Sequence, residues 1–408
     1  MLYYITQYIE EIFHIPGFSL FRYISFRAAM AAICALMLSI IFGKCLINFF
    51  NKHQIKEGIR DLGLHEQGVK AEVPTMGGII IIAGTVIATF LFAKFKNIYI
   101  VLLLITTVWM GFIGWLDDYI KVFKKDKKGL AGKFKVAGQV VLGLVVSLVL
   151  LFNSEVVIRE FGANMAIENN QLELNEVVDM PYTDIKAIKT TIPFFKNNEF
   201  DYSILLPHAA SQYTWILYAL AIMFILSAVS NGANLTDGLD GLTAGTAAIV
   251  GTTLAILAYV SGNVIFSKYL NIMYIPEVAE ATVFITAFVA SCIGFLWYNT
   301  YPAQIFMGDT GSLVVGSIIA IMAIIIRKEL LIPLLCGVFL IENVSVILQV
   351  VFFKYTKYKS GIGKRIFKMA PIHHHFQILG IHEAKIVSRF WIVSVILAIL
   401  TLITLKVR

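Results

Sequence analysis

Charged residues are scarce in this chain, and their scarcity excludes an ordinary water-soluble fold. They make up 14% of the 408 residues, whereas a soluble domain carries about 25%. Hydrophobic residues account for 58% of the sequence and occur in long runs with few interruptions. Water is therefore not the main solvent of this protein.

Cysteine is also rare, and its placement excludes a disulfide framework or a cysteine-based zinc site. The four cysteines, Cys34, Cys45, Cys292 and Cys336, lie within or beside apolar runs, and none forms a CxxC pair. The sequence further lacks a Walker A motif, a GxSxG motif and the protein-kinase motif set. The net charge of +7 comes from basic loops, which favours membrane lipids and not nucleic acid as the partner.

The apolar runs predict an all-α integral membrane protein that forms a single polytopic domain over residues 1–408. They lack the alternation of barrel strands, and the hydrocarbon core offers no water to an unpaired backbone, so they must form helices. We expect about ten transmembrane helices of about 20 residues each. They lie near 23–43, 76–95, 98–116, 134–152, 213–230, 242–261, 280–297, 311–326, 330–353 and 387–405.

Lysine and arginine residues predict how these helices are oriented. If the N-terminus is outside, the inside loops hold three basic clusters, at 44–70, 121–135 and 354–385. This positive-inside bias puts both termini outside. Residues 153–212 are polar and acidic. They form an expected outside insertion between the fourth and fifth transmembrane helices, long enough for a small fold of its own.

Five polar clusters fall on the inside of the membrane by this topology, although lysine and arginine alone set the orientation. They are KAEVPTMGG (70–78), DDY (117–119), SNGANLTDGLDGLTAG (230–245), NTYPAQIFMGDTGS (299–312) and PIHHHF (371–376). Taken singly, DDY is typical of a polar helix end, and Asp309 could be no more than a helix cap. The regular spacing of acids and glycines in 230–245 favours a functional loop.

Acidic and basic groups on one face of a membrane protein predict phosphoryl transfer to or from a lipid. Carboxylate oxygens suit Mg²⁺, with Mn²⁺ as an alternative, whereas lysine and histidine suit phosphate oxygens. Positioning and charge neutralisation supply most of the catalysis in such reactions. The three adjacent histidines lack the spacing of a helical zinc pair, so phosphate or carbonyl recognition fits them better.

The motifs PTMGG, DDY, NLTDGLDGLTAG, FMGDTGSL and APIHHHF resemble those of the polyprenyl-phosphate N-acetylhexosamine-1-phosphate transferases. The resemblance covers nearly the whole chain apart from 153–212. It implies that phospho-N-acetylmuramoyl-pentapeptide moves from UDP-N-acetylmuramoyl-pentapeptide to undecaprenyl phosphate, with Mg²⁺, to give lipid I and UMP. It also implies a homodimer in a bacterial cytoplasmic (inner) membrane, with both termini and the 153–212 insertion periplasmic and the active-site cleft at the cytoplasmic face.

The resemblance assigns expected roles by position. Asp309 is the leading Mg²⁺ ligand, Asp117 and Asp118 hold or orient the metal and the lipid phosphate, and Asp117 resembles the base for that phosphate. His373 joins these carboxylates as an expected catalytic residue. The expected substrate-binding residues are Lys70, Thr75, Lys121, Lys133, Asn234, Leu235, Asp237, Asp240, Asn299, Phe306, Gln349, His374 and His375, with Phe306 stacked on the uracil.

Two other functions stay open at this point. A related transferase would use UDP-N-acetylglucosamine, and an assay of nucleotide-sugar donors separates it. An ion-coupled transporter would also place acids in membrane helices, although these clusters gather at one face and not at the midplane. For the mechanism, direct attack of the lipid phosphate is favoured over a covalent phospho-enzyme, because one metal can align both phosphates.

Overall fold

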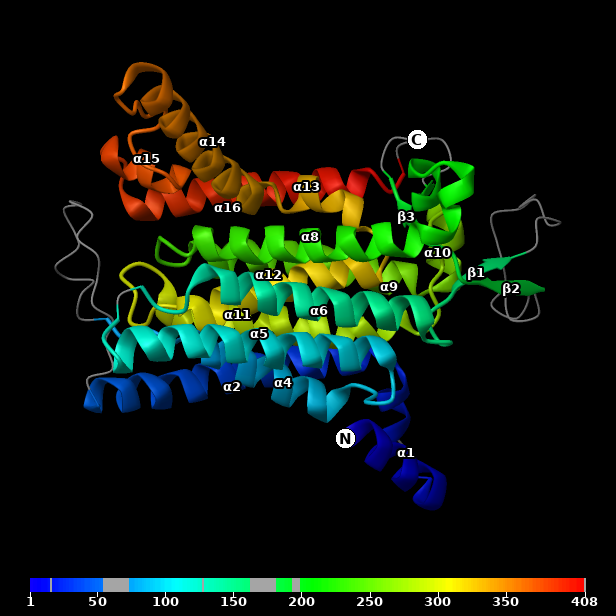
Figure 1. Ribbon diagram of the computed structural model, residues 1–408. Coiled ribbons are helices and arrows are strands. Elements are labelled where there is room, and N and C mark those ends of the chain that lie inside the picture. Colours follow the sequence, from blue (N-terminus) through cyan, green and yellow to red (C-terminus); the bar gives the residue numbers. More distant parts are fainter. Residues whose placement is uncertain (15–16, 54–72, 127, 162–180, 193–198, 407–408) are drawn as a thin grey trace.

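The chain folds into a bundle of long helices that run between two ends of the molecule (Figure 1). The computed structural model describes residues 1–14, 17–53, 73–126, 128–161, 181–192 and 199–406. Among these residues, nine helices are long and apolar enough to cross a membrane. They are α2 (Ile24–Lys52), α5 (Ile98–Phe123), α6 (Gly132–Phe152), α8 (Thr214–Thr236), α9 (Leu242–Ser261), α11 (Ala281–Asn299), α12 (Gly308–Ile325), α14 (Gly337–Ser360) and α16 (Glu383–Ile403). The expectation of a helical membrane protein is confirmed.

The second expected transmembrane helix, near 76–95, is shorter than predicted. It is α4 (Gly78–Phe92), a helix of 15 residues. At 1.5 Å per residue α4 is about 22 Å long, less than the ~30 Å of a hydrocarbon core. It packs against α2 and α11. The other α-helices of the described residues are shorter still: α1 (Leu2–Phe13), α10 (Val264–Leu270), α13 (Ile332–Leu335) and α15 (Ile372–Ile378).

Helix α12 lies at the centre of the bundle and is buried along almost its whole length. Lipid tails give no hydrophobic drive for helices to associate, so close contact through small residues becomes decisive. Gly316 of α12 meets the backbone of α8, because an added Cβ would lie 2.6 Å from both the Ser230 Cα and the Val229 carbonyl oxygen. Gly84 of α4 likewise meets the hydroxyls of Ser39 and Ser291. Small side chains therefore set the spacing of the inner helices.

A buried ion pair joins three helices at one end of the bundle. Arg27 of α2 contacts Glu280, just before α11, through both ends of its guanidinium, with Nη2 2.8 Å from Oε2. Both side chains are almost fully buried. Arg27 Nη1 also donates to the Phe92 carbonyl at the end of α4, and Glu280 Oε1 accepts from the Lys94 amide at 2.8 Å. The charges are thus paired and the last carbonyl of α4 has a donor.

The segment expected to form an insertion contains two small antiparallel sheets. Strand β1 (Ile158–Phe161) pairs with β2 (Tyr182–Ile185), and β3 (Lys189–Thr191) pairs with β4 (Glu199–Asp201). They lie at the end of the bundle where α12 finishes (Figure 1). The Thr191 amide donates to the Arg327 carbonyl at 2.9 Å, and Lys328 Nζ donates to the Thr191 hydroxyl at 3.1 Å. Burial lowers the pKa of Lys328 to about 8.

The buried ion pair leads to a prediction about stability. Arg27→Ala leaves the Glu280 carboxylate buried and unpaired, which costs about 3–5 kcal/mol. A denaturant titration of the protein in detergent measures this loss in the free energy of unfolding. Arg22→Ala is the control, because the Arg22–Glu10 pair is exposed on the arginine side and such pairs contribute about 1 kcal/mol at most. Equal losses in the two variants would contradict a structural role for the buried pair.

Candidate active site

Three carboxylates meet where α5 ends and α12 begins. Asp117 and Asp118 lie near the end of α5, and Asp309 is the second residue of α12. One oxygen atom from each lies within 4.8 Å of the others. Asp117 and Asp118 are fully buried, and Asp309 is 9% exposed. Hard carboxylate oxygens at this spacing suit a divalent cation such as Mg²⁺.

Asp118 caps the first turn of α12 from a different helix. Its Oδ1 accepts from the Asp309 amide at 3.1 Å, and its Oδ2 accepts from the Thr310 amide at 2.9 Å and the Thr310 hydroxyl at 2.6 Å. A carboxylate at a helix N-terminus satisfies amides that have no partner inside the helix and complements the helix dipole. This cap fixes Asp309 relative to α5.

Two lysines neutralise the carboxylate cluster. Lys121 Nζ lies 2.6 Å from Asp117 and 3.4 Å from Asp309. Lys135 Nζ lies 2.9 Å from Asp117 Oδ1 and also pairs with Asp309. Lys121 and Lys133 were the predicted substrate-binding lysines of this region; Lys133 is exposed, with its ammonium over the Phe134 ring, and its role stays a prediction. Lys135 is the lysine of α6 that contacts the carboxylates, and it was not predicted.

Glycines let the backbones at the site approach closely. A Cβ on Gly114 of α5 would collide with the Asp309 carbonyl and would lie 2.6 Å from the Thr310 Cα. The PTMGG segment pairs with the chain before α12, since the Phe306 amide donates to Pro74 and the Gly77 amide donates to Phe306, both at 2.8 Å. Thr75, between these bonds, is buried beside Gly308. Phe306 is partly buried.

The loop between α8 and α9 is fixed by residues from other segments. The Asp240 amide donates to Glu383 at 2.7 Å, and its carboxylate accepts from the Ala303 amide at 3.1 Å. Asn299 accepts from the Gly241 amide at 3.0 Å. Asp237 lies beside the Gly308 backbone, and burial, with the nearby charges, raises its pKa well above the usual range. Asn234 and Leu235 lie partly buried in the last turn of α8.

The three adjacent histidines open α15 and face different partners. His373 is fully buried, and its Nδ1 lies 3.1 Å from Oε2 of Glu342 on α14. His374 Nδ1 contacts the Gln377 side chain at 2.7 Å, and His375 Nδ1 accepts from the Lys368 amide at 3.1 Å. Glu342 was not among the residues predicted from the sequence. An acid inside the apolar run 330–353 was the signal that could have revealed it.

Gln349 of α14 supports the chain that leads to the histidines. Its Oε1 accepts from the Ile366 and Phe367 amides, and its Nε2 donates to the Phe367 carbonyl, all at 3.0 Å.

The predicted site residues that the structure describes lie at one end of the bundle. Lys70 lies outside the described residues. Roles for these residues in binding substrate stay predictions.

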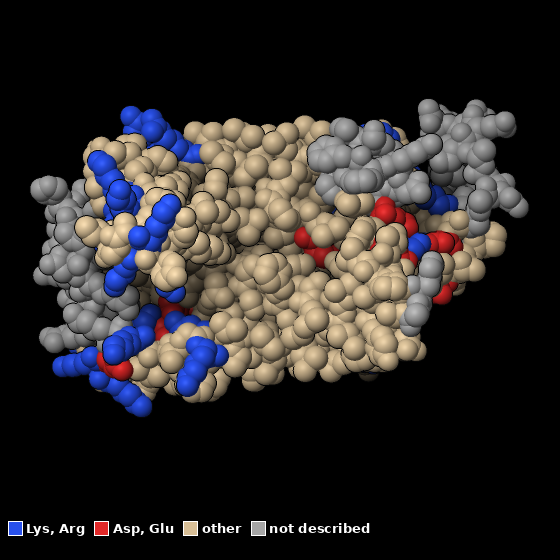
Figure 2. All heavy atoms as spheres, turned by 45° about the horizontal axis from the view of Figure 1, so that its top comes forward, with Lys and Arg blue, Asp and Glu red and all other residues tan. Residues whose placement is uncertain are grey.

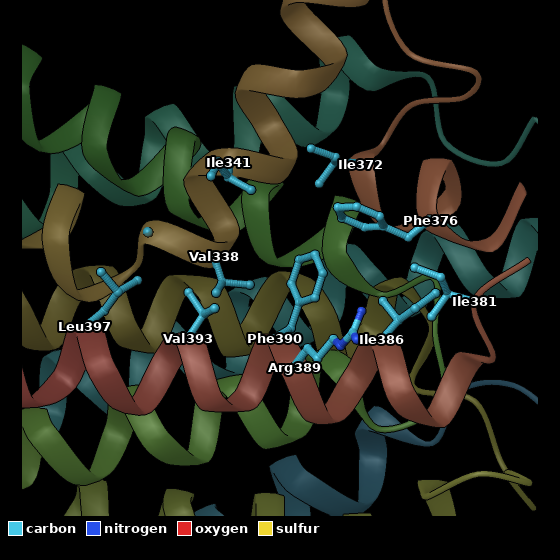
Figure 3. A pocket seen from close by; sticks show the side chains of 11 residues that line it. Val338, Ile341, Ile372, Phe376, Ile381, Ile386, Arg389, Phe390, Val393 and Leu397 are labelled. Atoms are coloured by element: carbon cyan, nitrogen blue, oxygen red, sulfur yellow. The ribbon is translucent and has the colours of Figure 1, made fainter. Parts of the chain in front are cut away.

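Charge and shape also distinguish this end of the molecule. Lysine and arginine side chains gather over it, with acidic atoms visible between them, and a broad uncharged band separates it from the opposite end (Figure 2). An apolar cavity of about 440 Å³ lies between α14, α15 and α16. Val338 and Ile341 line it from α14, and Ile372 and Phe376 line it from α15 (Figure 3).

Comparison with known proteins agrees with this geometry. The model of glycosyl transferase family 4 matches residues 99–327, a range that holds all three carboxylates. A phospho-N-acetylmuramoyl-pentapeptide-transferase of Amoebophilus asiaticus is 68% identical over 409 residues, which cover 100% of both chains. The chain belongs to the phospho-N-acetylmuramoyl-pentapeptide-transferases. Transferases of this name from Flavobacterium psychrophilum and Parabacteroides distasonis are 56% and 52% identical, each over 100% of both chains.

The close approach at Gly114 gives a prediction for this transferase. Gly114→Ala forces α12 away from α5 and displaces Asp309 from Asp117 and Asp118. Misplacing a reacting group by about 1 Å can cost about 100-fold in rate, so we expect a loss of that size in transferase activity. Gly132→Ala is the matched control, because a Cβ there meets no atom within 4 Å. Normal activity in folded Gly114→Ala would show that this contact does not position the carboxylates.

Proposed function

We propose that this protein transfers phospho-N-acetylmuramoyl-pentapeptide from its UDP donor to undecaprenyl phosphate, giving lipid I and UMP. Identity of 68% over the whole length with a transferase of that name carries the proposal. The reaction is the first membrane step of peptidoglycan synthesis. It needs a site that neutralises several phosphate charges at a membrane surface, and the carboxylate and lysine cluster is of that kind.

We propose Mg²⁺ as the cofactor, with Asp117, Asp118 and Asp309 as the residues that would hold it. The donor set fits, since three carboxylates with oxygens within 4.8 Å of one another offer the hard ligands that this ion prefers. Asp309 and Asp117 are the leading ligands, because both oxygens of Asp118 already accept bonds from the first turn of α12. When bound, the ion would neutralise phosphate oxygens and align the two substrates.

The proposed reaction is a direct displacement, because one metal can align both phosphates. An oxygen of the undecaprenyl phosphate forms a bond to the β-phosphorus of the donor. The bond from that phosphorus to the oxygen bridging the two phosphates breaks, and UMP leaves. Asp117 accepts any remaining proton of the lipid phosphate, while Lys121 and Lys135 stabilise negative charge on phosphate oxygens. The N-terminal amides of α12 add positive potential at the same place.

We further propose that the carboxylate end of the bundle is cytoplasmic and that α4, although shorter than the hydrocarbon core, supplies the tenth membrane crossing. The basic side chains at this end support the orientation through the positive-inside bias. In this proposal the strands of 158–201, which lie at the end of the bundle where α12 finishes (Figure 1), are on the periplasmic side of a bacterial inner membrane together with both termini. The apolar cavity between α14, α15 and α16 suits part of the prenyl chain of the acceptor.

Two remaining points of the proposal concern selectivity and assembly. The expected roles of Asp237, Asp240, Asn299 and Phe306 in binding the nucleoside imply selection for a uridine donor. A homodimer, implied by the family resemblance, is tested by mass measurement in detergent.

The transporter alternative is disfavoured by membership of a transferase family and by carboxylates that lie at helix ends and not in mid-membrane.

A transfer assay with purified protein tests the function. It contains UDP-N-acetylmuramoyl-pentapeptide and undecaprenyl phosphate, with or without Mg²⁺, and compares the wild type with Asp309→Ala. We expect UMP and a lipid-linked product only with the metal, and a loss of roughly 10²–10³-fold in the variant, as for other groups that stabilise transition-state charge. Product only from UDP-N-acetylglucosamine would assign the protein to a related transferase. No product from either donor would refute the proposed function.

Lys135 provides a second test, which separates the two lysines of α6. Lys135→Ala removes the cation shared by Asp117 and Asp309, so kcat should fall by about 10–100-fold, the range for residues that orient catalytic ligands. Lys133→Ala, two residues away and exposed, tests the expected substrate-binding role of Lys133 and should raise the donor KM without the larger fall in kcat. If Lys133→Ala is the more damaging change, the phosphates approach from the outer face of α6 and the assignment of Lys135 is wrong.

A further inference from the structure

A carboxylate in the interior of a membrane helix needs a partner, and Glu342 is such a residue. It lies in α14, one of the helices long and apolar enough to cross a membrane, and its side chain is fully buried. Charged groups in membrane helices are costly, and they pair with one another or mark function. The partner of Glu342 is His373, whose imidazole is also fully buried.

The contact between these residues puts the Glu342 carboxylate against one edge of the imidazole. Nδ1 of His373 lies 3.1 Å from Oε2 of Glu342. Ile372 and Phe376 of the same short helix point into the apolar cavity that α14 and α16 border (Figure 3), and this packing fixes the rotation of α15. His373 is therefore held by its helix on one side and by the carboxylate on the other.

The opposite edge of the imidazole contacts the loop between α8 and α9. A Cβ on Gly238 would collide with His373 Nε2 and would lie 2.9 Å from Cε1. The neighbouring residue, Asp237, lies beside the Gly308 backbone, next to Asp309. A continuous series of contacts thus leads from Glu342 through His373 and the loop to the start of α12.

We propose that Glu342 is a positioning residue of the transferase site, which acts by clamping His373 against Gly238 and so fixing the loop that bears Asp237 and Asp240. The inference rests on the proposed function and deepens it. It also assigns His373 a role: the buried imidazole supports the donor-binding loop. Two neighbouring contacts hold the same loop, from Glu383 to the Asp240 amide and from Asn299 to the Gly241 amide.

A double-mutant cycle with two readouts tests the proposal. Glu342→Ala, His373→Ala and the double variant are compared for donor KM, for kcat and for hydrogen exchange of the amides of 237–241. We expect each single variant to raise the donor KM by about tenfold, the low end for a carboxylate that orients a histidine, with a smaller fall in kcat. Exchange of 237–241 should quicken by a similar factor. The double variant should be no worse than either single one, because both remove the same contact.

Further variants separate positioning from loss of folding. Glu342→Gln keeps the shape of the side chain without its charge, and Glu342→Asp keeps the charge. Each should raise the donor KM less than Glu342→Ala does. Gly238→Ala disturbs the contact from the opposite side and should reproduce the raised KM. Glu329→Ala is the matched control: this buried acid lies at the opposite end, where it accepts from Tyr202 at 3.1 Å, so its effect should add to that of His373→Ala.

The outcomes distinguish this inference from the proposed function. If the wild type forms no product while exchange of 237–241 quickens equally in the single and double variants, the function fails and the clamp stands. Additive effects of Glu342→Ala and His373→Ala overturn the clamp. If the wild type is active, two further results overturn the clamp. One is unchanged exchange of 237–241 in the variants, and the other is faster exchange while KM and kcat stay at their wild-type values.

Discussion

The site depends on one contact, the cap that Asp118 places on the first turn of α12. Three bonds from that turn to one carboxylate join two helices whose residues lie almost 200 positions apart. They can form only because Gly114 lets the α12 backbone come close to α5. The cap satisfies amides that would otherwise lack partners and holds Asp309 against Asp117. Lys121 and Lys135 then offset the negative charge that this arrangement concentrates.

Buried charged groups lie at the two ends of the bundle. At one end the carboxylates, lysines and the Glu342–His373 pair form the site. At the other, Arg27 pairs with Glu280, and Tyr202 donates to Glu329. Between the ends the helices pack through apolar and small side chains. A membrane protein cannot leave such charges unpaired, so each charged cluster also fixes the helices that contribute to it.

The site was largely predictable where a motif combined acids with glycines. NLTDGLDG was interpreted as functional by itself, whereas DDY and FMGDTG were interpreted so only together with the other clusters. The structure brings Asp117, Asp118 and Asp309 together. Lysines were harder to place, because a lysine in a basic loop looks like any other. Lys133 and Lys135 differ by only two positions, and the rotation of α6 decides which one reaches Asp309. The lone acid of α14 carried a weak signal that pointed to no partner.

The sequence by itself determined the helical membrane fold, the approximate positions of its spans and the chemical class of its site. It could do so because hydrophobic length and runs of polar residues are local properties of the chain. Only the tertiary structure decided that Asp118 caps α12, that Lys135 joins the carboxylates and that Glu342 holds His373. Each of these contacts joins residues from separate helices, and their distances depend on how the helices pack and rotate, which no local pattern records.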